Sequence, residues 1–451
     1  MLARFAGGGD PDLVTRVAAE GPRDWLLAQL ARPPSGRLLA DGATPAALAA
    51  TYKRPGARQR RMDMSLGFGA LLRRLSERQA VTAIESPAPV EASLVAFWFD
   101  HFNVYARKGP IAYLTADYVD RALRPHVLGP FEALLLATAR HPAMLHYLDN
   151  AHSVREGLRD GRGLNENYAR ELLELHTLGV HGGYTQADVR ATAEVLTGWN
   201  TVPDDAMVRA YRFRARAHDP GTKTILGVRY PTRPEEAGEA EGETLLRRLA
   251  LHPATAQRIA TKLAARFVAD PPPPSLVSAL AEEYTSRRGD LGAVLRALVS
   301  RPEFWAPLHR GQLVKTPLDF VVSAVRTVGG RVVDPKGLRR ALHEMNMSPF
   351  LCPPPTGYER DPARWANGAG MMTRMRFARH LAAGKAGITF DLDRIVPSAR
   401  PLAALTEHVL RGAAAASTVA ALRDVLGGGS DDRGRRRALA VALASPQFST
   451  F

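Results

Sequence analysis

Apolar residues recur at helical spacing along most of the chain. Trp25, Leu26, Leu27 and Leu30, for example, share one side of a predicted helix. Helices are predicted over residues 11–32 (two, broken at 21–22), 44–52, 63–80, 89–107, 115–147 (two), 165–179, 185–196, 243–251, 253–269, 275–287, 290–300, 316–328, 335–345, 368–383, 402–412, 415–426 and 432–445. The pattern therefore predicts an all-α protein, built as a multi-helix bundle or array.

The helical pattern stops between residues 198 and 234. Few apolar residues remain there, among Gly, Asp and Pro, and they lack the 3.6-residue period. We expect a long ordered loop with at most one short β-hairpin, which would pair residues 210–214 with residues 224–229. The acidic stretch 235–243 then resembles a surface linker, so the chain divides loosely into a first region, 1–234, and a second, 235–451, packed as one unit.

Composition narrows the class of protein. The 451 residues are 45% hydrophobic and 23% charged, which is typical of a globular chain. The single cysteine, Cys352, excludes an internal disulfide and a zinc site built on several cysteines. No run is apolar and long enough to span a membrane. As written, the chain has no signal peptide, which predicts a cytoplasmic location; a longer native N-terminus would allow a periplasmic one.

The formal charge of +15 raises the question of nucleic-acid binding. Lys and Arg together number 60, yet only seven of these are lysines, and the arginines are dispersed along the chain. No aromatic-and-basic binding module accompanies them. Nucleic acid is therefore the least favoured of the partners considered.

The most informative segment is the predicted helix at 165–179. At 100° per residue its polar residues, Glu166, Asn167, Arg170, Glu171 and Glu174, fall on one side. In one interpretation this is an exposed face with i,i+4 ion pairs, each contributing about 0.2–0.5 kcal/mol. In the other it is a buried cluster, in which Arg170 holds one carboxylate and Glu171 or Glu174 serves as base or ligand. Spacing alone favours the exposed face.

Two further places carry candidate chemistry. His101 shares an aromatic helix face with Trp98, where a histidine is more often a satisfied core residue than a ligand or proton carrier. His218 and Asp219 lie in the long loop, where Asp-Pro-Gly favours a simple turn. Together with Glu171 or Glu174 they would make a metal site, and Trp199 would wall its pocket.

Several stretches resemble one known family, the bacterial domain of unknown function 1800 (DUF1800). The resemblance covers nearly the whole chain, and its most specific part is the string from Asn165 to Gly179. Other matching stretches are 21–26, 97–102, 141–150, 183–189, 197–199, 218–227, 252–256 and 445–448. Members commonly have Asn where this chain has Asp100, a change that would make His101 more basic if the two groups interact. The resemblance implies no settled activity, and many members carry export signals that this chain lacks.

Two functions remain open. The first is an enzyme that carries out metal-assisted hydrolysis or oxidation with a divalent metal. Arg170 would hold an anionic group, and His101 and His218 would act as metal ligands or acid/base groups. The residues that would bind the substrate are Glu166, Asn167, Trp98 and Trp199. The second is a helical binding partner or scaffold without catalysis. Its partner would be a co-encoded exported protein, because the resemblance implies neighbouring genes for proteins with phosphatase-like or sulfatase-like folds.

Overall fold

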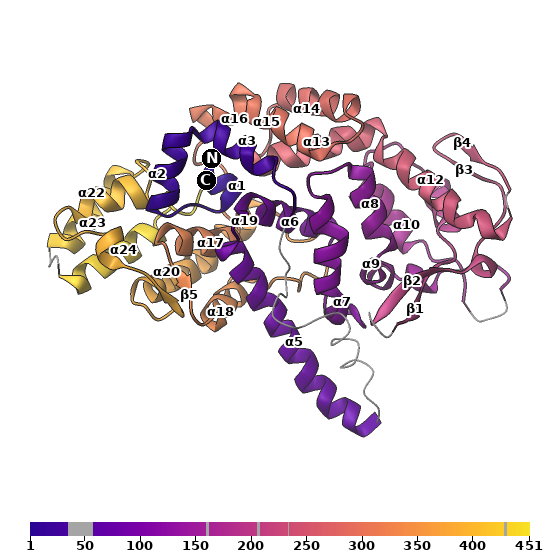
Figure 1. Ribbon diagram of the computed structural model, residues 1–451, viewed down its shortest axis with the longest axis horizontal. Coiled ribbons are helices and arrows are strands. Elements are labelled where there is room, and N and C mark those ends of the chain that lie inside the picture. Colours follow the sequence, from indigo (N-terminus) through magenta and orange to yellow (C-terminus); the bar gives the residue numbers. More distant parts are fainter. Residues whose placement is uncertain (35–56, 159–161, 205–207, 233, 428–430) are drawn as a thin grey trace.

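The computed structural model describes residues 1–34, 57–158, 162–204, 208–232, 234–427 and 431–451. Helices dominate these residues, so the prediction of an all-α fold is confirmed (Figure 1). The predicted helix at 44–52 lies outside the described residues. No helix within the described ranges combines the length and the apolar character needed to cross a membrane.

The first part of the chain is a series of short helices around one long one, α5. These elements are α1 (Leu2–Ala6), α2 (Pro11–Glu20), α3 (Pro22–Leu30), α5 (Ala57–Glu85), α6 (Pro89–His101), α7 (Ile111–Asp117), η1 (Tyr118–Leu123), η2 (Arg124–His126), α8 (Phe131–Arg140), α9 (Pro142–Tyr147), η3 (Asn150–His152), α10 (Asn167–Glu171), η4 (Leu172–His176) and α11 (Gln186–Val195). Proline at the first helical position and capping side chains set many of these starts. Thr185, for example, forms a capping box with Asp188.

One short helical turn, η5, lies inside the long loop, and the other helices of this half follow the loop. These are η5 (Ala215–Ala217), η6 (Glu235–Ala237), α12 (Gly238–Ala250), α13 (Pro253–Phe267), α14 (Pro274–Ser286), α15 (Leu291–Ser300), α16 (Pro302–Trp305), η7 (Pro307–His309), α17 (Pro317–Thr327), α18 (Lys336–Glu344), α19 (Pro362–Trp365), α20 (Gly368–Ala382), α21 (Leu392–Ile395), α22 (Pro401–Ala404), η8 (Leu405–Val409), α23 (Ala416–Gly427) and α24 (Asp432–Ala444). Where a helix was predicted, its bounds agree closely, because each apolar stripe is long and ends at Gly, Pro or a capping residue. The prediction of a surface linker at 235–243 is wrong, because η6 and α12 begin there and Glu241 is buried, and α16, α19 and α21 were not predicted.

The strands of the long loop pair differently from the prediction. β1 (Trp199–Pro203) pairs with β2 (Arg209–Phe213), and β3 (Lys223–Ile225) pairs with β4 (Val228–Tyr230), so residues 210–214 do not pair with 224–229. Each strand joins its nearest neighbour in sequence, which closes the shortest loop. Leu226 and Gly227, both with positive φ, form the tight turn between β3 and β4. With β5 (Arg331–Val332) and β6 (Ile388–Thr389), the described residues form three two-stranded sheets rather than a single hairpin.

Buried apolar residues form two main clusters. The first joins α1 to α16 and includes Phe350, and the second joins α17 to α24 with Ala80 and Ile84 of α5. The first cluster thus continues across residues 234 and 235, where the sequence suggested a division. Along the chain, the first cluster gives way to the second between Phe304 and Phe320. In Figure 1, α22–α24 occupy one end of the molecule, the strands β1–β4 occupy the other, and the two chain ends lie close together.

Candidate functional site

Asp100, in the last turn of α6, borders two small cavities. Each has a volume of about 40 Å³, and both are lined by Ala96, Asp100, Leu318 and Met347. The segment 349–360 covers them from the other end of the chain, and the Tyr358 amide donates a long hydrogen bond to Asp100 Oδ1 (3.4 Å). Each cavity has room for roughly three water molecules.

The covering segment reaches Asp100 because residue 357 is glycine. Gly357 has a φ of 72°, and a Cβ atom built on it would lie 2.3 Å from the carbonyl oxygen of Asp100. Any other residue would therefore be strained by its backbone and would also collide with α6. Asn103 fastens the same segment, since its amide nitrogen donates to the carbonyls of Cys352 (3.0 Å) and Pro354 (2.7 Å).

A second carboxylate, Asp319, lies beside the second cavity and is fully paired. It accepts hydrogen bonds from Arg266 (3.1 Å), Arg360 (3.1 Å) and the Thr316 hydroxyl (2.8 Å). Arg266 is only 4% exposed, and its Nε and Nη1 atoms have no acceptor among the described residues. The second cavity is therefore lined by a buried guanidinium with two unused donors.

The two carboxyl groups have opposite electrostatic surroundings. Burial raises the pKa of Asp100 to about 6, against the opposing charges of Arg360 and Lys262, because no cation of the described residues contacts the carboxylate directly. Burial also acts on Asp319, but Arg266 and Arg360 outweigh it and hold the pKa of Asp319 well below its usual range. Neighbouring groups whose pKa values are driven apart in this way are typical of acid–base sites.

The partly buried Lys262 and the buried His101 form a hydrogen-bonded pair next to Asp100. Lys262 Nζ lies 2.9 Å from His101 Nδ1, and His101 Nε2 lies 3.1 Å from the carbonyl oxygen of His176. Burial, with Arg258, lowers the pKa of Lys262 to about 7, and burial with Lys262 lowers the pKa of His101 well below its usual value. Burial therefore keeps His101 neutral. Asp100 is not among the groups that shift this pKa, so the interaction on which a more basic His101 depended is not made.

The predicted polar helix is real, but its middle is distorted. α10 runs into a π-helical turn, η4, which turns His176 into the core, where it is 1% exposed and its two imidazole nitrogens have no hydrogen-bond partner in the described chain. Burial lowers the pKa of His176 to about 3. Single π-turns inside α-helices are frequent at functional sites. Arg258 of α13 stabilises this turn by donating twice to the Leu175 carbonyl (3.1 and 3.0 Å).

The polar face of this helix is neither fully exposed nor a buried cluster. Asn167 is exposed, whereas Glu166, Arg170, Glu171 and Glu174 are half-buried. Arg170 donates to Glu166 (3.3 Å) and to the side chain of Gln186 of α11 (2.9 Å), and Glu174 accepts a long hydrogen bond from Tyr184 (3.4 Å).

Glu171 differs from the other carboxylates of this face in its hydrogen bonding and its pKa. Its side chain has no hydrogen-bond partner in the described ranges, and burial together with Glu174 raises its pKa against the effect of Arg170. The raised pKa fits the acid or base role that the sequence suggested, which stays a prediction.

His218 and Asp219 belong to a separate network that holds the long loop against α12. His218 Nε2 lies 3.3 Å from Glu241, and Lys223 Nζ lies 3.0 Å from the same carboxylate. The interactions of His218 are with Thr197 and α12, not with Glu171 or Glu174. No three or more His, Cys, Asp and Glu side chains are grouped to hold a metal ion in the parts of the chain that the structure describes.

The two predicted binding tryptophans lie in the core. Trp98 and Trp199 are both fully buried, and their indole nitrogens have no acceptor among the residues described. Trp199 packs under Gly242 of α12, while Arg140 lies over its ring at 5.6 Å. Trp98 packs edge-on against His101, with ring centroids 5.3 Å apart.

Sequence reasoning missed most of the residues around Asp100, yet one signal was present. Arg258, Lys262 and Arg266 follow one another at i,i+4 spacing on α13, next to the buried stripe of Ile259, Leu263 and Phe267. Three cations aligned beside an apolar face indicate partners in the interior. The contacts of Asp319, Tyr358 and Arg360 join distant parts of the chain and leave no such signal.

Comparison with known proteins places the chain in one family. The model of the family described as "Protein of unknown function (DUF1800)" matches residues 1–450, so the chain belongs to this family. No curated protein and no solved structure matches it. The family assignment therefore supplies no activity.

Proposed function

We propose that the protein is an enzyme in which Asp100 transfers a proton to or from a small substrate. The observation that supports this most directly is the position of Asp100: a carboxyl group with a pKa near 6 borders two adjoining cavities and has no direct cationic partner in the part of the chain that the structure describes. A carboxyl group of this kind exchanges protons readily near neutral pH. Members with Asn at this position would lack the group, so the proposal concerns the chemistry of this chain.

The neighbours of Asp100 have distinct roles in this proposal. Arg266 offers its two unused donors to an anionic or carbonyl oxygen of the substrate, and Asp319 orients Arg266 and Arg360. Lys262 supplies a nearby charge that favours the ionised form of Asp100. His101 holds Lys262 and is a positioning residue. Because the cavities are small, a substrate of more than a few atoms requires the segment 349–360 to move.

Asp100→Asn is the variant that tests this function. Hydrolysis of p-nitrophenyl acetate, phosphate and sulfate is measured for the native protein and the variant, since these three substrates cover esters with neutral and anionic groups. Removing a general acid or base is expected to lower the rate about 10²- to 10⁴-fold. Equal rates for the two proteins would contradict the proposal. Glu171→Gln, measured in parallel, tests the other candidate base.

A second candidate function, a binding partner, is favoured by a groove at the other end of the molecule. The groove has a volume of about 1190 Å³ between α20, α23 and α24, and Met372 and Met375 are 64% and 52% exposed in it. Arginines surround it: Arg376, Arg379, Arg433, Arg436 and Arg437. An apolar floor with a basic rim is complementary to an acidic amphipathic helix of a partner protein.

Met375→Glu tests this second function, because it places a negative charge in the floor of the groove. Gel filtration with a co-encoded phosphatase-like or sulfatase-like protein is expected to give a complex with the native chain and none with the variant. Val333→Glu is the matched control, since Val333 is 62% exposed and does not line the groove. A complex that survives Met375→Glu would contradict this function.

A further inference from the structure

A larger cavity, distinct from the Asp100 site, lies where the two ends of the chain meet. Its volume is about 790 Å³, within the range of pockets that bind small molecules. It is enclosed by α1, the segment 304–311, the end of η8 and residues 447–451. Four basic side chains line it, Arg4, Arg310, Lys315 and Arg411, and no Asp or Glu residue is among the lining residues.

Among the described residues, the hydrogen bonds of these basic side chains go to backbone carbonyls. Arg4 donates to the carbonyls of Phe267, Phe304 and His309, and Lys315 Nζ donates to the Phe448 carbonyl (2.6 Å). Carbonyls satisfy these hydrogen bonds but carry no counter-charge, and burial, with the charge of Arg411, lowers the pKa of Lys315 well below its usual value. Buried charge without a counter-charge is costly.

Arg411 is the basic residue with an unused donor. Its Nη2 atom has no acceptor among the described residues, while its own carbonyl accepts a hydrogen bond from Arg310. Burial, with the charge of Arg310, lowers the pKa of Arg411 to about 10, so the guanidinium remains protonated at neutral pH. The Arg310 guanidinium is thus held against the backbone of Arg411, and both residues line a cavity that has room for an anion.

The remaining wall is aromatic and apolar. Phe304, Trp305, Phe448 and Phe451 line the cavity, and the Phe448 ring lies 4.0 Å from Lys315 Nζ. Trp305 is 38% exposed. A ligand here would place an apolar or aromatic body against these rings and an acidic group against the arginines.

We infer that this cavity is a binding site for a small organic anion, with a carboxylate, sulfonate or phosphate group held by Arg411 and Arg310 and an apolar body packed on Phe304 and Phe448. The inference does not depend on the proposed function, because it uses none of the residues around Asp100.

The probe for this site is 8-anilino-1-naphthalenesulfonate, an aromatic sulfonate whose fluorescence reports binding. Its neutral analogue, N-phenyl-1-naphthylamine, has the same rings and lacks the acidic group. Arg411→Gln is expected to weaken binding of the sulfonate about 10- to 100-fold, the loss typical of a charge-assisted hydrogen bond, and to change binding of the neutral analogue less than about 3-fold.

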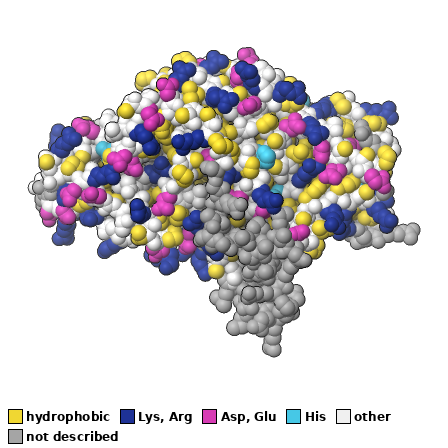
Figure 2. Space-filling model, viewed as in Figure 1, with side chains coloured by type: hydrophobic (Ala, Val, Ile, Leu, Met, Phe, Trp, Pro, Cys, Tyr) yellow, Lys and Arg dark blue, Asp and Glu magenta, His cyan; other side chains and the backbone are white. Residues whose placement is uncertain are grey.

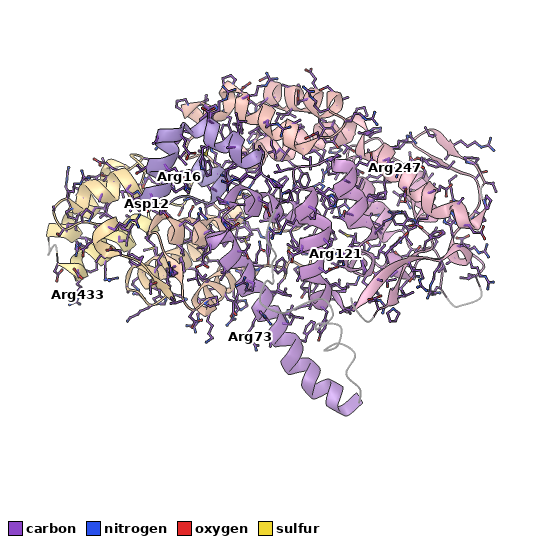
Figure 3. All side chains as sticks on the ribbon, viewed as in Figure 1. Asp12, Arg16, Arg73, Arg121, Arg247 and Arg433 are labelled. Carbon is purple, nitrogen blue, oxygen red and sulfur yellow. The ribbon has the colours of Figure 1, made fainter. Side chains whose placement is uncertain are left out.

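Two further variants keep the test decisive. Gln447→Glu adds a carboxylate to the cavity wall and retains the acceptor for the Thr418 hydroxyl (2.9 Å), so it is expected to weaken sulfonate binding without disturbing the fold. Arg433→Gln is the matched control, because Arg433 does not line this cavity and lies beside the methionine-lined groove at the α22–α24 end of the molecule (Figure 3). Unchanged sulfonate binding in both Arg411→Gln and Gln447→Glu, or a loss in Arg433→Gln alone, would overturn the inference.

Discussion

Lys262 Nζ lies 2.9 Å from Nδ1 of His101, and this contact fixes the state of both side chains. Since an ammonium group can only donate, Nδ1 accepts the hydrogen bond and the ring proton resides on Nε2, which donates to the His176 carbonyl. The pair therefore joins α13, α6 and the π-helical turn η4. This contact positions Lys262 beside Asp100, where each charge affects the other.

The free energy of unfolding of Lys262→Met, relative to that of the native protein, should fall as the pH rises. The pKa of Lys262 is lowered in the folded protein to about 7, so the buried ammonium opposes folding below pH 7, and this opposition disappears between pH 7 and 10.5. The stability of the variant minus that of the native protein is therefore expected to fall over that interval. Urea unfolding at pH 6, 8 and 10 measures it, and a difference that rises with pH would contradict the assigned shift.

Asp319→Ala is expected to destabilise the protein by about 3–5 kcal/mol. The variant leaves Arg266 and Arg360 without their shared carboxylate, and a buried charge that loses its partner is strongly destabilising. Asp12→Ala is the control, since Asp12 is 78% exposed and pairs with Arg394 at the surface (Figure 3). It should change the free energy of unfolding by less than about 1 kcal/mol. Equal effects of the two variants would contradict the account of Asp319.

Gly357→Ala should destabilise the protein by about 2–4 kcal/mol. The methyl group would collide with the Asp100 carbonyl, and the left-handed backbone adds about 1 kcal/mol of strain. Gly384→Ala separates these causes, because Gly384 has a similar φ of 71° and nothing within 4 Å of its Cβ position. Thermal or urea unfolding of the two variants is compared. If Gly384→Ala is as unstable as Gly357→Ala, the collision with the Asp100 carbonyl does not explain the loss of stability.

Glu241→Gln tests the network that orders the long loop. Glu241 is buried and contacts both His218 and Lys223, so its neutralisation leaves the buried Lys223 ammonium with only the longer contact to the Asp219 carboxylate (3.7 Å). We expect a loss of about 3 kcal/mol and faster proteolysis between residues 215 and 232. The neighbouring Glu239→Gln, on the same helix but 37% exposed, should cost less than about 1 kcal/mol. Unchanged proteolysis in Glu241→Gln would show that the loop is ordered by other contacts.

The helical framework could be predicted because its signals are local. The helix at 165–179 and the start at Thr316 depend on apolar spacing and on capping residues within a few positions. The strand pairing of the loop was predicted wrongly because several alternative registers have similar local patterns, and chain closure selects the nearest partners.

The candidate site was harder to predict. His101 was found from its sequence setting, but its partners Lys262 and His176 come from other elements. Whether Asp100 borders a cavity depends on Gly357 and Tyr358, more than 250 residues away, and no local pattern encodes that contact.

The positions of the basic side chains could be predicted from the sequence only in part. Basic side chains are spread over the visible face and alternate with acidic ones (Figure 2), as the dispersed arginines of the sequence suggested. Several arginines are instead buried, among them Arg4, Arg266 and Arg374. A count of charges cannot separate these two populations, so net charge was a poor guide to partners.

On this account Asp100 is a partly buried carboxyl group whose ionisation opposes folding, as expected of a group kept for chemistry. Its pKa is raised in the folded state to about 6, above the usual range of an aspartate, so stability present below about pH 4 is lost as the pH rises through 6. The direct measurement is urea unfolding of the native protein and of Asp100→Asn between pH 4 and 8. We predict that the stability of the variant relative to the native protein rises by about 1–2 kcal/mol across this interval. The value is this small because water screens a partly exposed charge. A difference that stays constant from pH 4 to 8, or that favours the native protein as the pH rises, would contradict the account.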